Sequence, residues 1–130
     1  MDLDTLLNKN QKEAATYLDS HLRIIAGAGS GKTRVVTYRI AHLIQDVGID
    51  PRSILAITFT NKAANEMKER VNEVVGIHGS GTLICTIHSL CVRFLRQHIN
   101  ILNYPSNFTI MDEEDQKALI KKLYTQLRSE

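Results

Sequence analysis

A glycine-rich segment followed by a lysine and a threonine is the part of the sequence whose residue types point most directly to a chemistry. The segment reads Ala26, Gly27, Ala28, Gly29, Ser30, Gly31, Lys32 and Thr33. It matches the phosphate-binding pattern GxxxxGK(S/T), except that an alanine takes the place of the first glycine. Glycines let several backbone N–H donors approach phosphate oxygens, the lysine adds positive charge, and the threonine hydroxyl can bind Mg²⁺. The segment therefore predicts a nucleotide-binding loop.

A phosphate-binding loop of this kind connects a strand to a helix, and the sequence predicts both elements. The apolar run 22–26 predicts a short strand before the loop, and apolar residues at helical spacing from Lys32 onward predict a helix after it. Gly48 stands where that helix is expected to end. An ordinary glycine-rich turn between a strand and a helix is the alternative explanation.

Strand and helix patterns continue to alternate along the chain. Helices are expected at 8–18, 61–75, 88–99 and 112–127, and strands at 54–59, 82–86 and 108–111. Asn61 is expected to cap the helix that starts there. The inner face of the helix at 88–99 is expected to consist of Leu90, Cys91, Phe94, Leu95 and Ile99. The alternation predicts an α/β fold in which helices flank both faces of a parallel sheet.

Composition places the chain among folded globular proteins with one domain. It has 130 residues, 43% of them hydrophobic, and a formal net charge of +2, which is too small to indicate nucleic-acid binding by itself. Cys85 and Cys91 form no zinc-ligand pattern and are expected to be free thiols. Without a signal pattern or an apolar run of about 18 residues, we expect a cytoplasmic protein with no membrane partner.

The segments after the loop narrow the class of nucleotide-binding protein. A GTPase normally offers Asn-Lys-x-Asp to guanine, whereas Asn61-Lys62-Ala63-Ala64 lacks the aspartate. A small P-loop nucleotide kinase or other P-loop transferase is the remaining alternative, but it would need a lid and arginines for a second substrate. The basic residues cluster instead in two later segments, around residues 58–70 and 86–96.

Several segments, in this order, resemble the superfamily 1 DNA helicases of the UvrD/PcrA/Rep family. Leu7-Asn8, Gln11 and Ala14 are similar to the family's Q motif, in which the glutamine amide donates to and accepts from the adenine edge. Arg34 occupies the position from which the family stacks a guanidinium on the adenine ring. Taken alone, Gln11 would be interpreted as a solvent-exposed helix residue and Arg34 as a solvated helix charge.

The segment Thr58-Phe59-Thr60-Asn61-Lys62-Ala63-Ala64 resembles motif Ia of the same family. The resemblance implies that Phe59 stacks on a base of single-stranded DNA and that Thr60 and Asn61 reach phosphate. Such a position fits the carboxyl edge of a parallel sheet, where ligands bind. The alternative for Phe59 is a core position at the end of a strand, whereas for Asn61 the helix-cap role and the phosphate role can coexist.

The segment Thr86-Ile87-His88-Ser89 is similar to the family's motif Ib, with isoleucine in place of the usual phenylalanine. The resemblance implies that Thr86, His88 and Ser89 contact the DNA backbone, although a lone histidine is more often structural. Arg93 and Arg96 follow on one helix face, and solvation is the simplest account of both.

Asp112 and Glu113 follow an apolar run and so look like a Walker B pair that would hold Mg²⁺. We interpret them differently, because the run is short and half-polar and because Asp112 can cap the following helix while Asp115 lies near its positive end. In the family, the true acidic motif comes later in the chain.

The resemblance implies that residues 1–130 are the first part of a RecA-like P-loop motor domain that ends before Walker B. It implies ATP and Mg²⁺ as cofactors, single-stranded DNA and duplex junctions as partners, and a second motor domain in the same protein. The implied activity is ATP-dependent 3′ to 5′ unwinding or translocation in DNA repair and replication. Lys32 and Thr33 would be the catalytic residues of this part. Alone, it is expected to be inactive as an ATPase.

Overall fold

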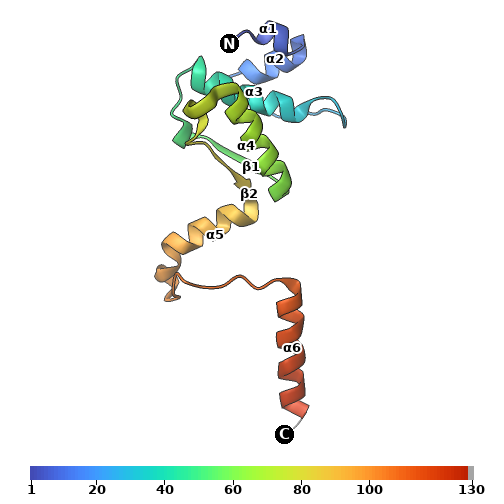
Figure 1. The fold of residues 1–130 in the computed structure, drawn as a ribbon, viewed down its shortest axis with the longest axis vertical. Helices are drawn as coiled ribbons and strands as arrows, with labels where there is room; N and C mark the ends of the chain where they lie inside the picture. Colours follow the sequence, from blue (N-terminus) through green and yellow to red (C-terminus); the bar gives the residue numbers. More distant parts are fainter. Residues whose placement is uncertain (129–130) are drawn as a thin grey trace. The chain divides into compact units, whose positions relative to one another are not determined.

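The computed structural model describes residues 1–128, and the chain divides into two compact units, Met1–Leu90 and the part from Cys91 onward. The first unit contains the helices α1 to α4 and both strands (Figure 1). All residues with predicted nucleotide or DNA roles lie in this first unit. The last of them are Thr86, at the end of β2, and His88 and Ser89 just after it. The first unit therefore positions the whole candidate site.

Two short helices open the chain, and side chains set where each begins. Helix α1 (Leu3–Leu6) starts after Asp2, whose carboxylate accepts from the N–H of Asp4. Helix α2 (Lys9–Thr16) starts after Asn8, which forms a reciprocal capping box with Gln11. The helix expected at 8–18 is therefore present but shorter, because the chain turns to extended backbone at Tyr17.

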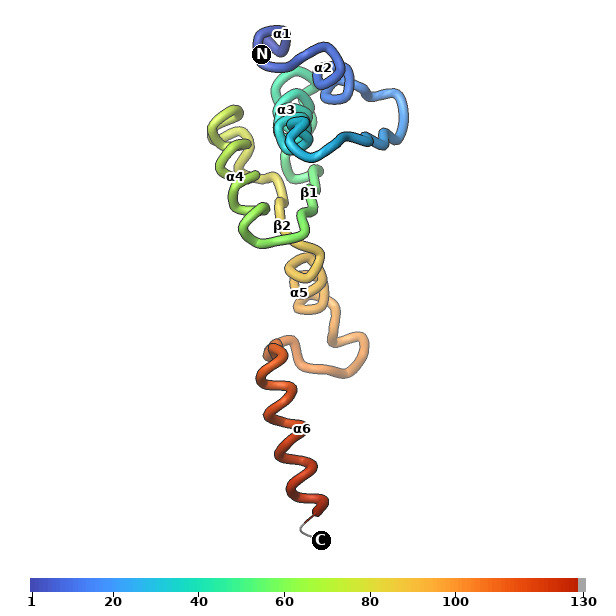
Figure 2. The backbone as a smooth tube through the Cα atoms, turned by 90° about the vertical axis from the view of Figure 1, so that its right-hand side faces the viewer, coloured from blue at the N-terminus to red at the C-terminus, as the bar shows by residue number. Residues whose placement is uncertain are grey.

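Helices α3 (Lys32–Gln45) and α4 (Asn61–Val75) pack against each other (Figure 2). The end of α3 agrees with the sequence analysis, since Gly48 follows it with φ of 80° and the N–H of Ile49 donates to the carbonyl of Leu43. The prediction that Asn61 caps α4 is wrong. The cap is Thr60, whose hydroxyl accepts from the N–H of Ala63, so the helix starts one residue after its cap.

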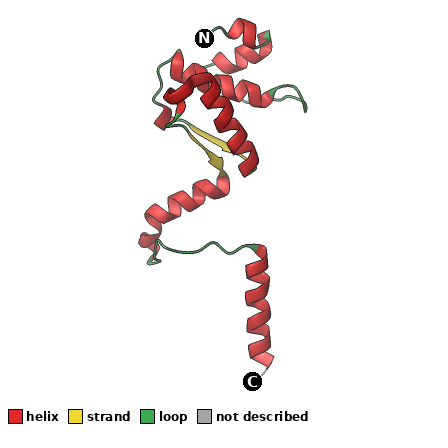
Figure 3. Ribbon diagram, in the orientation of Figure 1, coloured by secondary structure: helices red, strands yellow, loops and turns green. Residues whose placement is uncertain are grey.

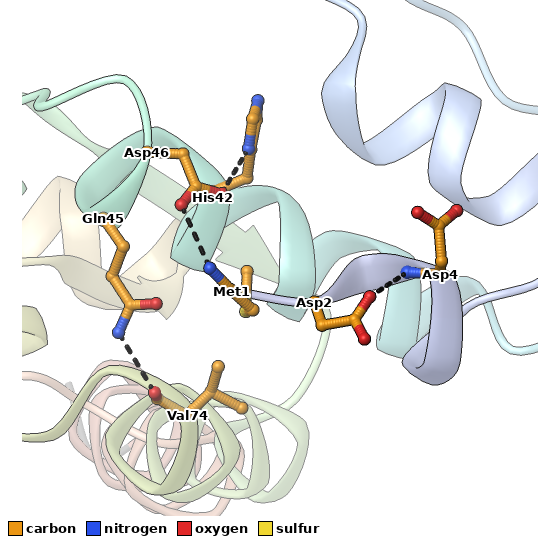
Figure 4. A network of polar contacts seen from close by, with 7 residues as sticks. All are labelled: Met1, Asp2, Asp4, His42, Gln45, Asp46 and Val74. Atoms are coloured by element: carbon orange, nitrogen blue, oxygen red, sulfur yellow. Dashed lines mark hydrogen bonds and ion pairs between the residues drawn. The ribbon is translucent and has the colours of Figure 1, made fainter.

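Polar contacts at the C-terminal end of α3 join it to neighbouring segments. The carboxylate of Asp46 accepts from a ring nitrogen of His42 at 2.8 Å and from the Met1 amino group at 3.4 Å (Figure 4). The amide of Gln45 donates to the carbonyl of Val74 on α4 at 3.3 Å. The bonds of Asp46 join the last turn of α3 to the amino terminus of the chain, and the bond of Gln45 joins it to α4.

Strands β1 (Leu55–Thr58) and β2 (Leu83–Thr86) form a parallel pair, as predicted, in the register Leu55 to Leu83 through Thr58 to Thr86. Helix α4 packs on these strands and α3 packs on α4, which builds one buried cluster. Its buried members are Ile40, Ala41, Ala64, Met67, Val71, Val75 and Ile84. A second cluster joins α1, α2 and α3 through Leu3, Leu7, Ala15 and Val35.

The expected cover on both faces of the sheet is absent among the described residues. Leu55 and Ile57, which alternate with the covered residues of β1, remain 49% and 46% exposed. Two expected strands are also wrong, because 22–26 and 108–111 have no regular structure (Figure 3). A strand needs a hydrogen-bonded neighbour, and neither segment pairs with another strand among the described residues. In the first of them, Ile25 is 85% exposed.

Short 3-10 helices connect the larger elements at Pro51–Ser53 (η1), Gly76–Gly79 (η2) and Ile99–Leu102 (η3). Helix α5 (Ile87–His98) follows β2 and agrees with the helix expected at 88–99. Helix α6 (Glu113–Arg128) agrees with the one expected at 112–127. The inner face expected for α5 is not formed within the described chain, where no residue of α5 is buried.

Candidate functional site

The glycine-rich loop ends at the first turn of α3 in a conformation that only glycine adopts easily. Gly29 and Gly31 have φ of 75° and 83°, and Gly31 is the residue before α3. Because no side chain caps this helix, its first N–H groups remain directed toward the loop. Together with the positive end of the helix dipole they form a cradle suited to phosphate oxygens.

Hydrogen bonds within the loop define its shape. The N–H and hydroxyl of Ser30 both donate to the carbonyl of Gly27, at 3.3 and 2.6 Å. The ammonium of Lys32 donates to the carbonyls of Ala26 and Gly27, each at 2.9 Å. Ala28, at the tip, is exposed, as is Thr33 in the first turn of α3. The Thr33 hydroxyl is thus open at the mouth of the loop, whereas the Lys32 ammonium is bonded to two loop carbonyls.

Gln11 reaches this loop from α2. Its side-chain nitrogen donates to the carbonyl of Ser30 at 3.2 Å, and its side-chain oxygen accepts from the N–H of Asn8 at 3.0 Å. A Cβ atom at Gly31 would lie 2.6 Å from the Gln11 nitrogen, so a glycine is needed there for this approach. The alternative that Gln11 is merely a solvent-exposed residue is therefore wrong.

A cavity of about 260 Å³ lies between α2, the segment before the loop and the start of α3. It is lined by Asn8, Asn10, Gln11, Ala14, Ile24, Ile25, Ala26, Ser30, Lys32 and Val35. Apolar walls with a few amides at one side suit a flat heterocycle with polar edges. Asn10 and Val35 line the cavity although neither was a predicted site residue, and Ile24 and Ile25 were expected only as part of a strand.

Arg34 binds the last residue of α1. Its Nε and Nη2 donate to the carbonyl of Leu6 at 3.1 and 2.8 Å, and its guanidinium lies 5.3 Å from the ring centre of Tyr38. Arg34 is nevertheless exposed, so the alternative of a solvated helix charge stays open beside these contacts. Stacking of Arg34 on adenine stays a prediction.

The ends of the two strands bring the second and third motifs together. Thr58 and Thr86 are register partners, so the residues that follow each strand leave the same edge of the sheet. Phe59 is fully exposed, and the alternative that it is a core residue is wrong. Thr60 is occupied as the cap of α4, while the adjacent Asn61 is exposed.

Thr86 lies differently from its neighbours, because it is only 5% exposed. Its hydroxyl accepts from the N–H of Ser89 at 3.2 Å and donates to the Ser89 hydroxyl at 2.9 Å, which caps the start of α5. His88 and Ile87 are exposed, and Ser89 is half-buried. Of this motif, His88 is the polar residue most open to a ligand.

In the second unit, Asp112 and Asp115 form a reciprocal capping box at the start of α6. The Asp112 carboxylate accepts from the N–H of Asp115 at 2.8 Å, and the Asp115 carboxylate accepts from the N–H of Asp112 at 3.3 Å. This is the cap expected from the sequence. Arg96, interpreted as solvated, is exposed, and it also donates to the carbonyl of Ser106 and lies over the ring of Phe108.

Among residues 1–128, no cluster of three or more His, Cys, Asp or Glu side chains could hold a metal ion. Cys85 and Cys91 are free, as expected. None of the described helices is both long enough and apolar enough to cross a bilayer.

Comparison with known proteins gives one consistent family. Residues 7–130 match the model of the UvrD/REP helicase N-terminal domain. The chain is 50% identical over 115 residues to the ATP-dependent DNA helicase PcrA of Staphylococcus aureus (strain Mu50), which covers 88% of this chain and 16% of that protein. It is also 50% identical over 115 residues to the ATP-dependent DNA helicase PcrA of Staphylococcus epidermidis (strain RP62A), again over 88% of this chain and 16% of that protein.

The match extends over the glycine-rich loop, the strand ends and the second unit alike, so it does not depend on the loop alone. It weighs against the small P-loop kinase or transferase that the sequence left open. The chain spans only 16% of the length of the relatives that it matches. It belongs to the UvrD/REP helicase N-terminal domain family.

Proposed function

We propose that residues 1–130 are part of a RecA-like P-loop motor domain that binds ATP and single-stranded DNA in an ATP-dependent helicase. The observation that carries this proposal is the hydrogen bond from Gln11 to the carbonyl of Ser30. It joins the residue expected to recognise adenine to the loop expected to hold phosphates, around one cavity. An isolated glycine-rich turn would not require that contact.

At the nucleotide, the backbone from Ala26 to Thr33 would cradle the phosphates and Lys32 would leave the loop carbonyls to neutralise the terminal phosphate. The Thr33 hydroxyl would bind Mg²⁺, which supplies charge neutralisation between the phosphates. Gln11 would bond to the adenine edge and Arg34 would stack on its face. A Cβ added at Gly27 or Gly29 would meet no heavy atom within 4 Å, and such open space fits a ligand that approaches the backbone.

At the sheet edge, Phe59 would stack on a base and Asn61, His88 and Ser89 would reach the DNA backbone. Stacking tolerates any base, which suits a protein that moves along a strand. Thr60 and Thr86 cap the helices that follow them, so each would help to position the neighbouring DNA-binding residues. Any contact of their own with DNA would be additional to this capping role. We propose 3′ to 5′ movement on single-stranded DNA and unwinding at duplex junctions.

We further propose that the Walker B carboxylates and a second motor domain lie outside residues 1–130. Phosphoryl transfer to water needs a positioned water and compensation of developing charge, which an arginine of a second domain commonly supplies. The capping box at Asp112 supports this division, because that carboxylate already bonds within its own helix start. Residues 1–130 alone should then bind nucleotide weakly and hydrolyse none.

The test is ATP hydrolysis by the full-length protein with and without single-stranded DNA. We expect strong stimulation by DNA, and unwinding of a duplex with a 3′ tail but not of one with a 5′ tail. A protein that transfers phosphate to a small acceptor and ignores DNA would overturn the proposal in favour of a kinase. The tail preference tests the polarity separately from the ATPase.

A further inference from the structure

Arg39 of α3 makes a set of contacts that the nucleotide and DNA motifs do not account for. Its Nη1 donates to three carbonyls, those of Ala14 at 3.1 Å, Ala15 at 3.4 Å and Tyr17 at 2.6 Å. The side chain is half-buried. Carbonyls in the last turn of a helix lack partners within it, so a cation from another helix satisfies them and also complements the helix dipole.

Helix α2 depends on such outside support. It has 8 residues, which is too short to be stable alone in water. Its N-terminal end is fixed by Asn8 and by the contact of Gln11 with the glycine-rich loop. Its C-terminal end is fixed by Arg39, one helical turn after Val35, which packs against Ala15. Hydrogen bonds at both ends therefore set the direction in which α2 points.

Arg39 lies on the same helix as Lys32 and Thr33, about two turns further along it. Helix α3 thus holds the phosphate-binding residues at its start and, through Arg39, the helix that presents Gln11. From this geometry we propose that Arg39 is a positioning residue for base recognition, which sets where Gln11 meets the purine without touching the nucleotide. The inference rests on the adenine-binding role proposed for Gln11.

Loss of Arg39 should therefore affect base selection more than phosphate chemistry. In the full-length protein, Arg39→Met keeps an apolar stem but leaves the three carbonyls without their donor. We expect the ratio of kcat/KM for ATP over GTP to fall on the order of tenfold, because a displacement of about 1 Å far from the chemistry can cost up to a hundredfold. The KM for ATP should rise, while kcat at saturating ATP and DNA stays within about twofold.

A double-mutant cycle with Gln11→Ala separates positioning from general support. If Arg39 acts through Gln11, the double variant should discriminate no worse than Gln11→Ala alone. Arg39→Lys should restore much of the ratio, since all three bonds come from one nitrogen that an ammonium can replace. Arg52→Met, which removes an exposed guanidinium paired with Asp50, is the matched control and should leave the ratio unchanged.

Three outcomes would overturn the proposal. An Arg39→Met protein that melts earlier but keeps the wild-type ratio would make Arg39 structural only, as would additive effects in the cycle. If Arg39→Met and Arg39→Lys both fail to fold, Arg39 holds the fold itself and not the position of Gln11. A wild-type protein without preference for ATP would refute the Gln11 role as well, which distinguishes failure of the proposed function from failure of this inference.

Discussion

Helices α3 and α4 lie against each other and have similar lengths, 14 and 15 residues, yet their N-termini are built differently. Helix α4 begins after Thr60, an extended residue whose hydroxyl accepts from the first turn. Helix α3 begins after Gly31, a left-handed residue that offers no side-chain cap. One helix start is satisfied by a side chain of its own chain, and the other has no side-chain cap.

Under the proposed function, this difference suits the two helix starts to different ligands. The uncapped N–H groups of α3 can bind an anion in the backbone itself, which fits phosphate. At α4 the cap uses that capacity, so a ligand must be met by the side chains beside it, of which Phe59 is fully exposed. Recognition by backbone favours a fixed chemical group, whereas recognition by an exposed ring tolerates a changing base.

The largest expected effect is at the start of α3. In the full-length protein, Lys32→Ala should lower ATP turnover by on the order of a hundredfold or more, because a preorganised positive charge is lost where negative charge develops. Affinity for single-stranded DNA should stay close to wild type, as measured by fluorescence anisotropy. Lys68→Ala, an exposed lysine on α4, is the control. Near-normal DNA-stimulated turnover in Lys32→Ala would refute the assignment of this helix start to phosphate.

At the start of α4 the opposite profile is expected. Phe59→Ala should weaken single-stranded DNA binding by about 1–3 kcal/mol, or uncouple unwinding from hydrolysis, with ATP affinity retained. Its melting temperature should not change, because the ring is fully exposed. A large drop in melting temperature with unchanged DNA affinity per folded molecule would instead assign the ring to packing in the complete protein.

Gly31→Ala should sharpen the comparison by changing the uncapped start itself. An alanine at φ of 83° costs about 1–2 kcal/mol, and here its Cβ would also collide with Gln11. Gly48→Ala is the matched control, since Gly48 has φ of 80° and nothing within 4 Å of a Cβ. Melting temperatures should fall in both variants, but KM for ATP should rise only in Gly31→Ala. Equal behaviour of the two would show that the Gln11 contact is unimportant.

The capped start should respond mainly in stability. Thr60→Ala should cost about 1 kcal/mol of the free energy of unfolding, whereas Asn61→Ala, one residue later and not the cap, should cost far less. If Asn61 contacts DNA, its variant should lose affinity at unchanged melting temperature. The reverse ranking of stabilities would restore Asn61 as the cap.

The smallest effect concerns the other end of α3. A hydrogen bond from His42 lowers the pKa of the Asp46 carboxyl below its ordinary 3.8. A carboxyl with a lowered pKa adds stability above its unfolded pKa and loses it as pH falls through the folded one. Asp46→Asn should therefore cost at most about 0.5 kcal/mol at pH 7, and the difference should shrink as the pH falls below 3.8 and through the folded pKa. A difference that does not change with pH would point to packing instead.

Local signals predicted the helices well. The bounds 61–75 of α4 agree with the structure, and so do the ends of α3 and α6 within a residue or two. Caps, glycines and helical spacing are contained in a few neighbouring residues, so the sequence displays them directly. The one misplaced cap, Asn61 for Thr60, arose because both residues are good caps and adjacent.

Strands were predicted less well, since a strand depends on a partner elsewhere in the chain. The segments 54–59 and 82–86 pair with each other and are present. The equally apolar segment 22–26 finds no neighbour and stays without regular structure. Likewise the contacts of Gln11 and Arg39 cross from α2 to the loop and to α3, and no spacing rule shows which carbonyl a long side chain will reach.

The hydrogen bond between Gln11 and Ser30 also has a consequence for the order of folding. It spans 19 residues, and the cavity around it uses only residues 8–35. The edge that carries Phe59 instead needs β1 and β2 to pair between Thr58 and Thr86. Contacts between near segments close faster than those between distant ones. During synthesis, we therefore expect the cavity around Gln11 to form before β2 pairs with β1 and completes the sheet edge.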